Sequence, residues 1–321
     1  METKTPMTDL VNDLKPANSS KPSSLSLPGV TVVIPVYNEV DSVRETLEEV
    51  SAHLEASGLT YEVMAVNDGS TDGTTQVFVD LELPHLTKLE HAQNRGYGAA
   101  LKTGIKNAAH DYVVITDADG TYPNERMAEF VEQAVEANCD MLVGARVGEN
   151  VQIPLIRKPA KKALNQLANY LSQTQIPDLN SGFRVMKKDV VKRFLHLLPD
   201  AFSFTTTITL AMLSDGFKVE YTPIDYFHRQ GNSKIKPIQD TVRFFQLVIR
   251  TVMYFNPLRV FVPLSLTLFA ASLLVFMIRI FAGGGLLAAS LILFVSAIQV
   301  LTTGMLADLI VKTNAGRRNA P

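Results

Sequence analysis

The chain has 321 residues, of which 46% are hydrophobic and 19% charged, with 30 basic and 32 acidic side chains. This composition excludes a mainly disordered chain, and the near-neutral charge argues against a nucleic-acid-binding protein, which would carry a basic surface. The single cysteine, Cys139, cannot form a disulfide within the chain. Residues 238–321 hold seven basic and two acidic residues, a net charge of +5, which leaves −7 for residues 1–237. An acidic body followed by a basic, apolar end favours a C-terminus at a membrane.

Residues 1–28 are rich in Ser, Pro, Lys and Asn and lack the apolar segment of a secretory signal, so we predict a flexible leader. From residue 29 to about residue 235 the pattern alternates between strands and helices. Apolar, β-branched runs predict strands at residues 30–36, 61–68, 86–92, 111–120, 139–146 and 217–227. Helices are predicted at residues 39–56, from residue 70, and at 98–109, 123–137 and 202–216. This order predicts an α/β fold with a Rossmann-like, doubly wound, mostly parallel sheet.

Polar positions lie at or just after the ends of four of the predicted strands, at 37–39, 67–69, 117–119 and 144–146. Ligands of such sheets bind at the carboxyl ends of the strands, so we expect these residues to meet at one edge. Asp117 and Asp119 offer two carboxylates, which suit a hard cation such as Mg²⁺ or Mn²⁺. A cation there would neutralise a pyrophosphate leaving group. Two aspartates at this spacing are also common in surface turns, but their place at a strand end favours the metal site.

The chain ends with two apolar segments, residues 261–278 and 286–307, which contain no charged residue. Each approaches the roughly 20 residues that cross a bilayer, so we predict two transmembrane helices within residues 258–312, at about 260–281 and 286–308. A pair of buried core helices is the alternative. Basic residues on both sides predict that the body, both termini and a basic tail at residues 313–321 are cytoplasmic. Residues 236–257 predict an amphipathic interfacial helix, with packing against the body as the alternative.

Seven short motifs follow one another over about 200 residues. They are IPVYNE at 34–39, NDGSTDGT at 67–74, NRGYGAALKTG at 94–104, DADG at 117–120, GAR at 144–146, DLNSGFR at 178–184 and RQGNSKI at 229–235. Together they resemble the family 2 glycosyltransferases with the GT-A fold. The resemblance is greatest to the polyprenyl-phosphate glycosyltransferases, the group that contains dolichyl-phosphate mannose synthase. It covers residues 30–235, the expected catalytic domain, and extends through the two-helix hairpin to the end of the chain.

The resemblance implies roles for the matching positions. The residues that would hold the nucleotide-sugar donor are Pro35, Tyr37, Glu39, Asp68, Lys102, Asp117 and Ala118. The residues that would bind phosphates of the donor or of a lipid acceptor are Arg146, Arg157, Arg184, Arg229, Ser233 and Lys234. Asp117 and Asp119 would also bind the metal. Relatives often continue this motif with Leu-Gln, where this chain has Gly120-Thr121, so Thr121 or water is the candidate third ligand. For Lys102 and the basic loop residues, a solvated surface charge is the alternative.

The segment expected to face the acceptor, residues 201–214, contains no carboxylate. Glycosyltransferases of this fold that attack with a sugar hydroxyl need a carboxylate base in that region, whereas a phosphate acceptor is already ionised at neutral pH. The absence therefore favours a lipid phosphate acceptor. Asp178 is the rival candidate, as a base or as a residue that orients the acceptor, and fixing the loop before Gly182 is its alternative role. The predicted catalytic residues are Asp117, Asp119, Asp178 and Arg229.

These inferences predict an inverting transfer of a sugar from a nucleotide-sugar to an undecaprenyl- or dolichyl-type monophosphate at the cytoplasmic membrane face. The expected cofactor is Mg²⁺ or Mn²⁺, and the expected partners are the donor, the lipid and the bilayer, with no nucleic acid and with homo-oligomerisation left open. A processive polysaccharide synthase is one alternative, disfavoured because the chain has no tryptophan for a Gln-x-x-Arg-Trp motif and too few spans for a channel. A catalytically silent nucleotide-sugar-binding scaffold is another, disfavoured by Asp68, Asp117 and Asp119.

Overall fold

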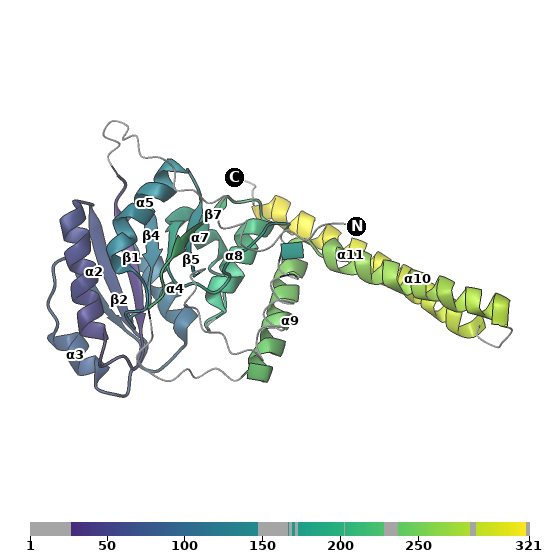
Figure 1. Cartoon of the computed structure of the whole chain (residues 1–321), viewed down its shortest axis with the longest axis horizontal. Coiled ribbons are helices and arrows are strands. Elements are labelled where there is room, and N and C mark those ends of the chain that lie inside the picture. Colours follow the sequence, from purple (N-terminus) through teal and green to yellow (C-terminus); the bar gives the residue numbers. More distant parts are fainter. Residues whose placement is uncertain are drawn as a thin grey trace.

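The computed structural model describes residues 27–146, 166, 169–170, 173–201, 203–227, 237–282 and 287–318. Figure 1 shows an α/β body and a long helical hairpin that projects from it. The strands are β1 (Val30–Val36), β2 (Tyr61–Asn67), β3 (Leu86–Glu90), β4 (Tyr112–Ile115), β5 (Met141–Arg146), β6 (Arg184–Lys187) and β7 (Val219–Ile224). The helices of the body are α2 (Val43–Ser57), α3 (Thr74–Asp80), α4 (Tyr97–Asn107), the 3-10 turn η1 (Asn124–Arg126), α5 (Met127–Glu136), α7 (Lys188–Phe194) and α8 (Phe204–Ser214).

The seven strands form one sheet in the order β3-β2-β1-β4-β6-β5-β7. All seven residues of β1 are buried, as its unbroken apolar sequence predicts for a central strand that is covered on both faces. β1 pairs in parallel with β2 and β4, and β5 pairs in parallel with β7. The predicted mostly parallel α/β sheet is therefore confirmed.

β6 is the exception to the parallel pattern, because it pairs antiparallel with both β4 and β5. It has only four residues and is an addition to the strands predicted above. Its antiparallel direction has a consequence for the ligand-binding edge. The start of β6 lies beside the carboxyl ends of β4 and β5, so the loop that leads into β6 reaches the edge where the four polar strand ends meet.

Helices cover both faces of the sheet, and a separate hydrophobic cluster fills each layer. On one face, alternate residues of β1, from Val30 to Val36, pack with α2, α3 and α5. On the other face, Val33 packs with α4, α7 and α8. Side chains alternate across a strand, so one apolar run supplies both clusters. Helix α7, which follows β6 directly, is an addition to the predicted elements.

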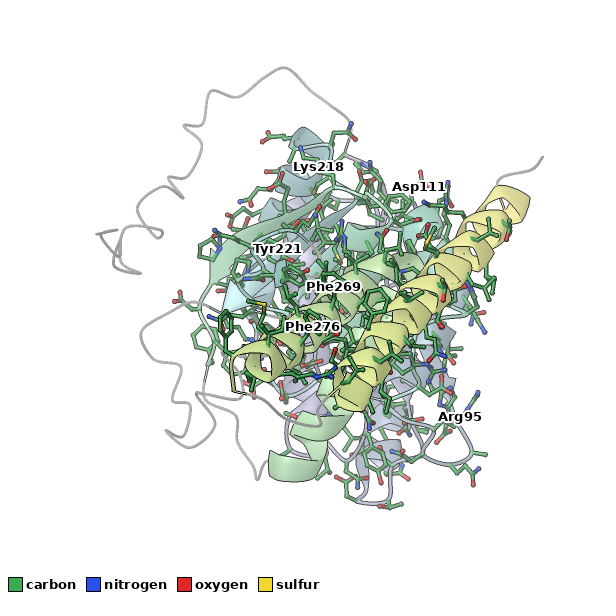
Figure 2. The ribbon with its side chains drawn as sticks, turned by 90° about the vertical axis from the view of Figure 1, so that its right-hand side faces the viewer. Arg95, Asp111, Lys218, Tyr221, Phe269 and Phe276 are labelled. Carbon is green, nitrogen blue, oxygen red and sulfur yellow. The ribbon has the colours of Figure 1, made fainter. Side chains whose placement is uncertain are left out.

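Two helices, α10 (Leu258–Ala282) and α11 (Leu287–Arg318), form the hairpin. Both are long and apolar enough to cross a membrane, over Leu258–Phe281 and Leu287–Thr313. Only 11% and 17% of their most apolar stretches are buried, so neither is a core helix of the body. Figure 2 shows Phe269 and Phe276 on α10, where the two residues are 47% and 40% exposed. Helix α11 continues past the predicted end at residue 308.

Inside the hairpin the two helices are fixed by small and hydroxyl-bearing residues. The hydroxyl of Ser265 donates to the carbonyl of Ala297 at 2.9 Å, and that of Ser272 donates to the carbonyl of Ser290 at 2.8 Å. A Cβ added at Gly304 would lie 2.4 Å from the Cβ of Phe261. Small residues at helix contacts and hydroxyl bonds across helices are typical of packing within membranes.

Helix α9 (Pro237–Phe255) joins the body to the hairpin. Its Val248 and Val252 are fully buried and pack with Ile176, Leu179 and Leu210 of the body. This part of the helix therefore follows the alternative expectation of packing against the body. Leu179 neighbours Asp178 in the loop before β6, so α9 contacts the segment that carries a predicted site residue.

Candidate active site

The motif Asp117-Ala118-Asp119 follows β4 at the ligand-binding edge, and helix α2 holds its backbone. The carbonyl oxygen of Ala118 accepts hydrogen bonds from the hydroxyls of Ser42, at 2.9 Å, and Thr46, at 3.1 Å. Ala118 is buried, whereas the two aspartates are partly exposed. The backbone between the carboxylates is therefore fixed while both side chains reach the edge.

Two groups from elsewhere in the sequence position the carboxylate of Asp117. The hydroxyl of Tyr97, at the start of α4, donates to its Oδ1 at 2.9 Å. Burial, together with the charge of Asp117, raises the pKa of Tyr97 well above its ordinary value of 10.0, so the phenol stays protonated as a donor. Gly182 lies on another side, where an added Cβ would be 3.0 Å from both carboxylate oxygens. Glycine at this position therefore lets the loop before β6 approach Asp117.

Asp119 is supported by Thr121, whose hydroxyl donates to its Oδ1 at 2.6 Å. Thr121 is fully buried, and its own carbonyl accepts from the amide of Phe227 at 3.0 Å. The hydroxyl acts through Asp119 and is not presented at the edge. The expectation that Thr121 supplies a third metal ligand does not fit this position.

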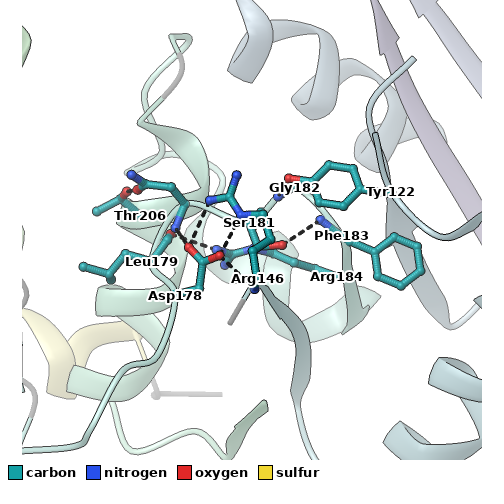
Figure 3. Close-up of polar contacts among 10 residues, drawn as sticks. Tyr122, Arg146, Asp178, Leu179, Ser181, Gly182, Phe183, Arg184 and Thr206 are labelled. Carbon is teal, nitrogen blue, oxygen red and sulfur yellow. Dashed lines mark hydrogen bonds and ion pairs between the residues drawn. The ribbon is translucent and has the colours of Figure 1, made fainter. Parts of the chain in front are cut away.

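Asp178, in the loop before β6, forms a two-pronged ion pair with Arg146 at the end of β5 (Figure 3). Nε and Nη2 of Arg146 donate to the carboxylate at 2.7 and 3.0 Å, and the amide of Asn180 donates to it at 3.0 Å. Burial opposes ionisation of Asp178, but the bonds and charge of Arg146 outweigh it and hold the pKa below its ordinary value of 3.8. Asp178 is therefore a weak base, and its contacts match the alternative role of fixing the loop.

Arg146 is also held by an aromatic ring, since its guanidinium carbon lies 5.1 Å from the centre of the Tyr226 ring. Tyr226 in turn contacts Tyr122 edge-on, and the hydroxyl of Tyr122 accepts from the amide of Gly182 at 2.6 Å. These contacts join the ends of β5 and β7 to the loop that faces Asp117. The arrangement positions a partly exposed guanidinium beside the loop, where it is suited to bind phosphate oxygens.

Arg184 is fully buried, which corrects the prediction that it binds phosphate. Its guanidinium donates to the carbonyls of Ser181, at 2.7 Å, and Leu179, at 2.9 Å (Figure 3). It also donates to the hydroxyl of Thr209 at 2.6 Å. Burial lowers the pKa of this guanidinium below its ordinary value. Through these bonds to the carbonyls of Leu179 and Ser181, the buried side chain stabilises the turn of residues 178–183, so its role is structural.

The loops after β1 and β2, together with the end of β3 and the segment after it, form a shallow cleft of about 580 Å³. It is lined by Tyr37, Gly69, Ser70, Thr71, Glu90, His91, Ala92, Gln93 and Asn94. The two loops are bonded to each other: the amide of Asn38 donates to the hydroxyl of Ser70 at 3.0 Å, and the amide of Glu39 donates to the hydroxyl of Thr74 at 3.0 Å. Tyr37, which is 37% exposed, gives this cleft an aromatic face.

Two other residues that were predicted to hold the nucleotide-sugar donor are buried. Pro35 is buried within β1, and Asp68 is only 2% exposed. The carboxylate of Asp68 accepts from the amides of Arg95, at 2.9 Å, and Gly96, at 2.7 Å, so it holds the segment before α4. Asp68 therefore shapes the wall of the cleft from inside.

Lys102 on α4 forms an ion pair within the protein. Its Nζ forms an ion pair with Oδ1 of Asp200 at 2.7 Å, in the loop before α8. Gly98, on the same helix, is so close to this loop that an added Cβ would lie 2.2 Å from the carbonyl oxygen of Pro199. In this structure Lys102 ties α4 to the loop before α8, and its predicted contact with the donor would require this pair to open.

Arg157, Arg229, Ser233 and Lys234 lie outside the described residues. Within the described part of the chain, no group of three or more His, Cys, Asp and Glu side chains is placed to hold a metal. The oxygens of Asp117 and Asp119 nonetheless fit a hard cation, because Mg²⁺ is commonly bound by one or two carboxylates together with substrate phosphates and water.

Three residues of the site were not predicted from the sequence: Tyr122, Tyr226 and His91. Their contacts depend on segments that are distant in the chain.

Comparisons with known proteins show which family the two parts of the chain resemble. The family model for glycosyl transferase family 2 matches residues 31–195, and the model for the GtrB C-terminal hairpin matches residues 256–313. A relative from Sodalis glossinidius (strain morsitans), an undecaprenyl-phosphate 4-deoxy-4-formamido-L-arabinose transferase, is 28% identical over 296 residues, which are 88% of each chain.

Solved structures show the same fold at low sequence identity. Mannosyl-3-phosphoglycerate synthase from Rubrobacter xylanophilus has a TM-score of 0.55 and 18% identity, over 70% of this chain and 73% of that one. Glucosyl-3-phosphoglycerate synthase from Mycobacterium tuberculosis, in complex with Mn²⁺, UDP and phosphoglyceric acid, has a TM-score of 0.53 and 15% identity, over 70% and 78%. The predicted GT-A fold is therefore confirmed.

Proposed function

Because this chain belongs to glycosyl transferase family 2, we propose that it transfers a sugar from a nucleotide-sugar to a polyprenyl monophosphate, with inversion at the anomeric carbon. The observation that carries the proposal is the union, in one chain, of a family 2 body and a hairpin of the GtrB type. The hairpin would keep the ligand-binding edge near lipid headgroups. The Sodalis glossinidius relative, named for undecaprenyl phosphate, is similar across both parts of the chain.

The donor nucleoside would occupy the cleft beside Tyr37, which the segments after β1, β2 and β3 line. An exposed phenol ring suits stacking against a planar base, and the polar residues around it suit hydrogen bonds to base and ribose. The diphosphate would then extend along the edge to Asp117 and Asp119. A divalent cation held by these carboxylates would neutralise the departing nucleoside diphosphate. The M. tuberculosis structure with Mn²⁺ and UDP supports this choice of ligand.

The acceptor would need little help from a base. A phosphate monoester is largely ionised at neutral pH, and helix α8, from Phe204 to Ser214, contains no carboxylate. Asp178 is engaged by Arg146 and has a lowered pKa, so proton abstraction is a poor use of it. Arg146 would instead orient a phosphate while Asp178 keeps its guanidinium fixed. Arg229, Ser233 and Lys234 remain predicted contacts of the lipid phosphate on sequence grounds.

The membrane orientation is part of the proposal. Arginines precede the hairpin and basic residues follow it, which by the positive-inside rule supports a cytoplasmic body and cytoplasmic ends of the hairpin. A cytoplasmic edge would meet nucleotide-sugars where they are made. A polyprenyl phosphate would approach it from the inner leaflet.

The decisive experiment offers a panel of radiolabelled UDP- and GDP-sugars, one at a time, to the full chain with polyprenyl phosphate and Mg²⁺. We expect one donor to give a labelled lipid that is lost when the lipid phosphate or the cation is left out. The anomeric configuration of that product, read by NMR, should be opposite to that of the donor. Binding of a nucleotide-sugar with no transfer to any lipid would contradict the proposal and favour a silent scaffold.

A further inference from the structure

His91 is a buried residue of the cleft wall that the sequence does not mark. It follows β3 directly and is only 7% exposed. Its Nδ1 lies 2.6 Å from Oδ1 of Asp68, and its Nε2 lies 2.9 Å from the hydroxyl of Thr103 on α4. The ring therefore bridges the end of β2 and helix α4 beneath the cleft.

The partners of Asp68 assign the proton on this ring. Its carboxylate already accepts two backbone amides, those of Arg95 and Gly96. An ionised carboxylate is only an acceptor, so Nδ1 of His91 carries a hydrogen and donates it. Nε2 then faces the hydroxyl of Thr103 at 2.9 Å. A chain of hydrogen bonds thus runs from α4 through His91 to Asp68 and on to the backbone before α4.

This chain of bonds sets the shape of the cleft. Gly69 packs backbone to backbone against the opposite wall, because an added Cβ would lie 2.5 Å from the carbonyl carbon of Gln93. With so little space, rotation of the Asp68 carboxylate would move the segment of residues 93–96 that it holds. Gln93 and Asn94 line the cleft, so their place depends on the orientation of Asp68.

We propose that His91 is a positioning residue for the nucleoside part of the donor, acting through Asp68 on the cleft wall. It does not touch the reacting atoms. The inference rests on the proposed function, because it takes the cleft to be the nucleoside site. In this role, the hydrogen bond from Nδ1 of His91 to Asp68 contributes more to donor binding than the contact of Nε2 with Thr103.

Two substitutions separate the two sides of the ring. In His91→Asn the amide nitrogen stands close to the place of Nδ1 and can still donate to Asp68. In His91→Gln the amide reaches further, toward the place of Nε2 and Thr103. We expect His91→Asn to keep donor binding within about threefold and His91→Gln to weaken it about tenfold, the effect of losing one hydrogen bond to a buried charge. His53→Gln, on the exposed face of α2, is the matched control.

The measurement is calorimetric titration of the full chain with UDP and with GDP in the presence of Mg²⁺, followed by KM and kcat for both substrates. We expect the donor KM to rise in His91→Gln while the KM for polyprenyl phosphate and kcat stay near wild type. Equal binding by the Asn and Gln variants, or an equal change in kcat and both KM values, would overturn the inference. If the wild-type chain binds neither nucleotide, the proposed donor site itself fails, and His91 with it. Should one variant unfold, Thr103→Val, expected to bind within about threefold of wild type, tests the Nε2 side alone.

Discussion

In the body the large apolar side chains lie mostly inside, whereas in the hairpin most of them lie outside. Val33 and Ile34 of β1 are fully buried, while Leu274 of α10 and Ile292 of α11 are 62% and 64% exposed. Burial of apolar surface drives folding in water, so the exposed apolar surface of the hairpin suggests anchoring in a membrane. The comparison separates two roles: the body would carry out the chemistry, and the hairpin would hold the body close to the lipid substrate.

The largest expected effect comes from the edge of the body. Asp119→Ala should lower turnover about 100-fold or more, because its carboxylate serves the cation and the leaving group. Melting temperature and membrane association should stay near wild type, since the side chain lies outside the core. The measurement is the rate of lipid labelling with Mg²⁺ at saturating donor. Asp111→Ala, an exposed carboxylate before the opposite end of β4, is the control, and a wild-type rate in Asp119→Ala would refute the metal assignment.

The second prediction removes the hairpin. A chain ended after Pro257 keeps Phe255, whose ring lies 6.2 Å from that of Phe194 in the body, and loses α10 and α11. We expect it to bind nucleotide as the full chain does, because the cleft is far from the cut. Transfer to bilayer-embedded polyprenyl phosphate should fall at least tenfold, since proximity is lost.

A short, water-soluble polyprenyl phosphate is the control substrate for this truncation. With it, the rates of the truncated and full chains should differ little. If the truncated protein still pellets with membranes after a high-salt wash, the hairpin is not the main anchor. If it no longer binds nucleotide, the body needs the hairpin to fold.

The third prediction concerns stability and pH. Asp178→Asn should destabilise the body by about 2 kcal/mol at pH 7, because it removes the charge that Arg146 binds. The pKa of Asp178 is depressed in the folded protein, so its contribution is complete above the unfolded value of about 4 and is lost as the pH falls through the folded value. Chemical unfolding of both proteins at pH 7 and at pH 3 measures the difference. It should shrink on acidification, and a constant difference would contradict the ion pair.

The smallest expected effect tests the approach of the loop to Asp117. Gly182→Ala adds a Cβ 3.0 Å from both carboxylate oxygens, so either the loop or the carboxylate must shift by a few tenths of an ångström. We expect kcat to fall about fivefold, because small displacements of a catalytic group are costly. Gly216→Ala, whose Cβ would meet nothing within 4 Å, should lower the melting temperature and leave kcat unchanged. An unchanged kcat in Gly182→Ala would show that the loop yields freely.

The two regions also differ in how far the sequence predicts them. In the hairpin, length and hydropathy suffice, because a helix in lipid satisfies its own backbone and needs only an apolar surface. In the body, β-branched runs predict β1, β2, β4 and β5, while the helix starts differ by several residues. The expected start near residue 70 becomes Gly73–Thr74, since Asp72 and its neighbours bond the loop after β1.

Within the site, too, some parts can be predicted from the sequence and others cannot. The place of Asp117 and Asp119 follows from the sequence, because a parallel sheet brings the ends of its strands to one edge. The place of the loop of residues 178–183 does not, because it depends on β6 running antiparallel between β4 and β5. Direction is a property of pairing with distant strands, and the four residues of β6 carry no local signal for it.

Charged residues show most clearly what cannot be predicted from the sequence. By itself the sequence determined the α/β body, the acidic strand end and the two apolar helices, since each rests on local pattern and solvent preference. Only the tertiary structure decided that Arg184 is buried under a turn, that Lys102 pairs with Asp200, and that Asp68 and His91 support a cleft wall. A motif fixes which charge is present, but its partner and its burial come from segments far apart in the chain, which meet only when the layers pack.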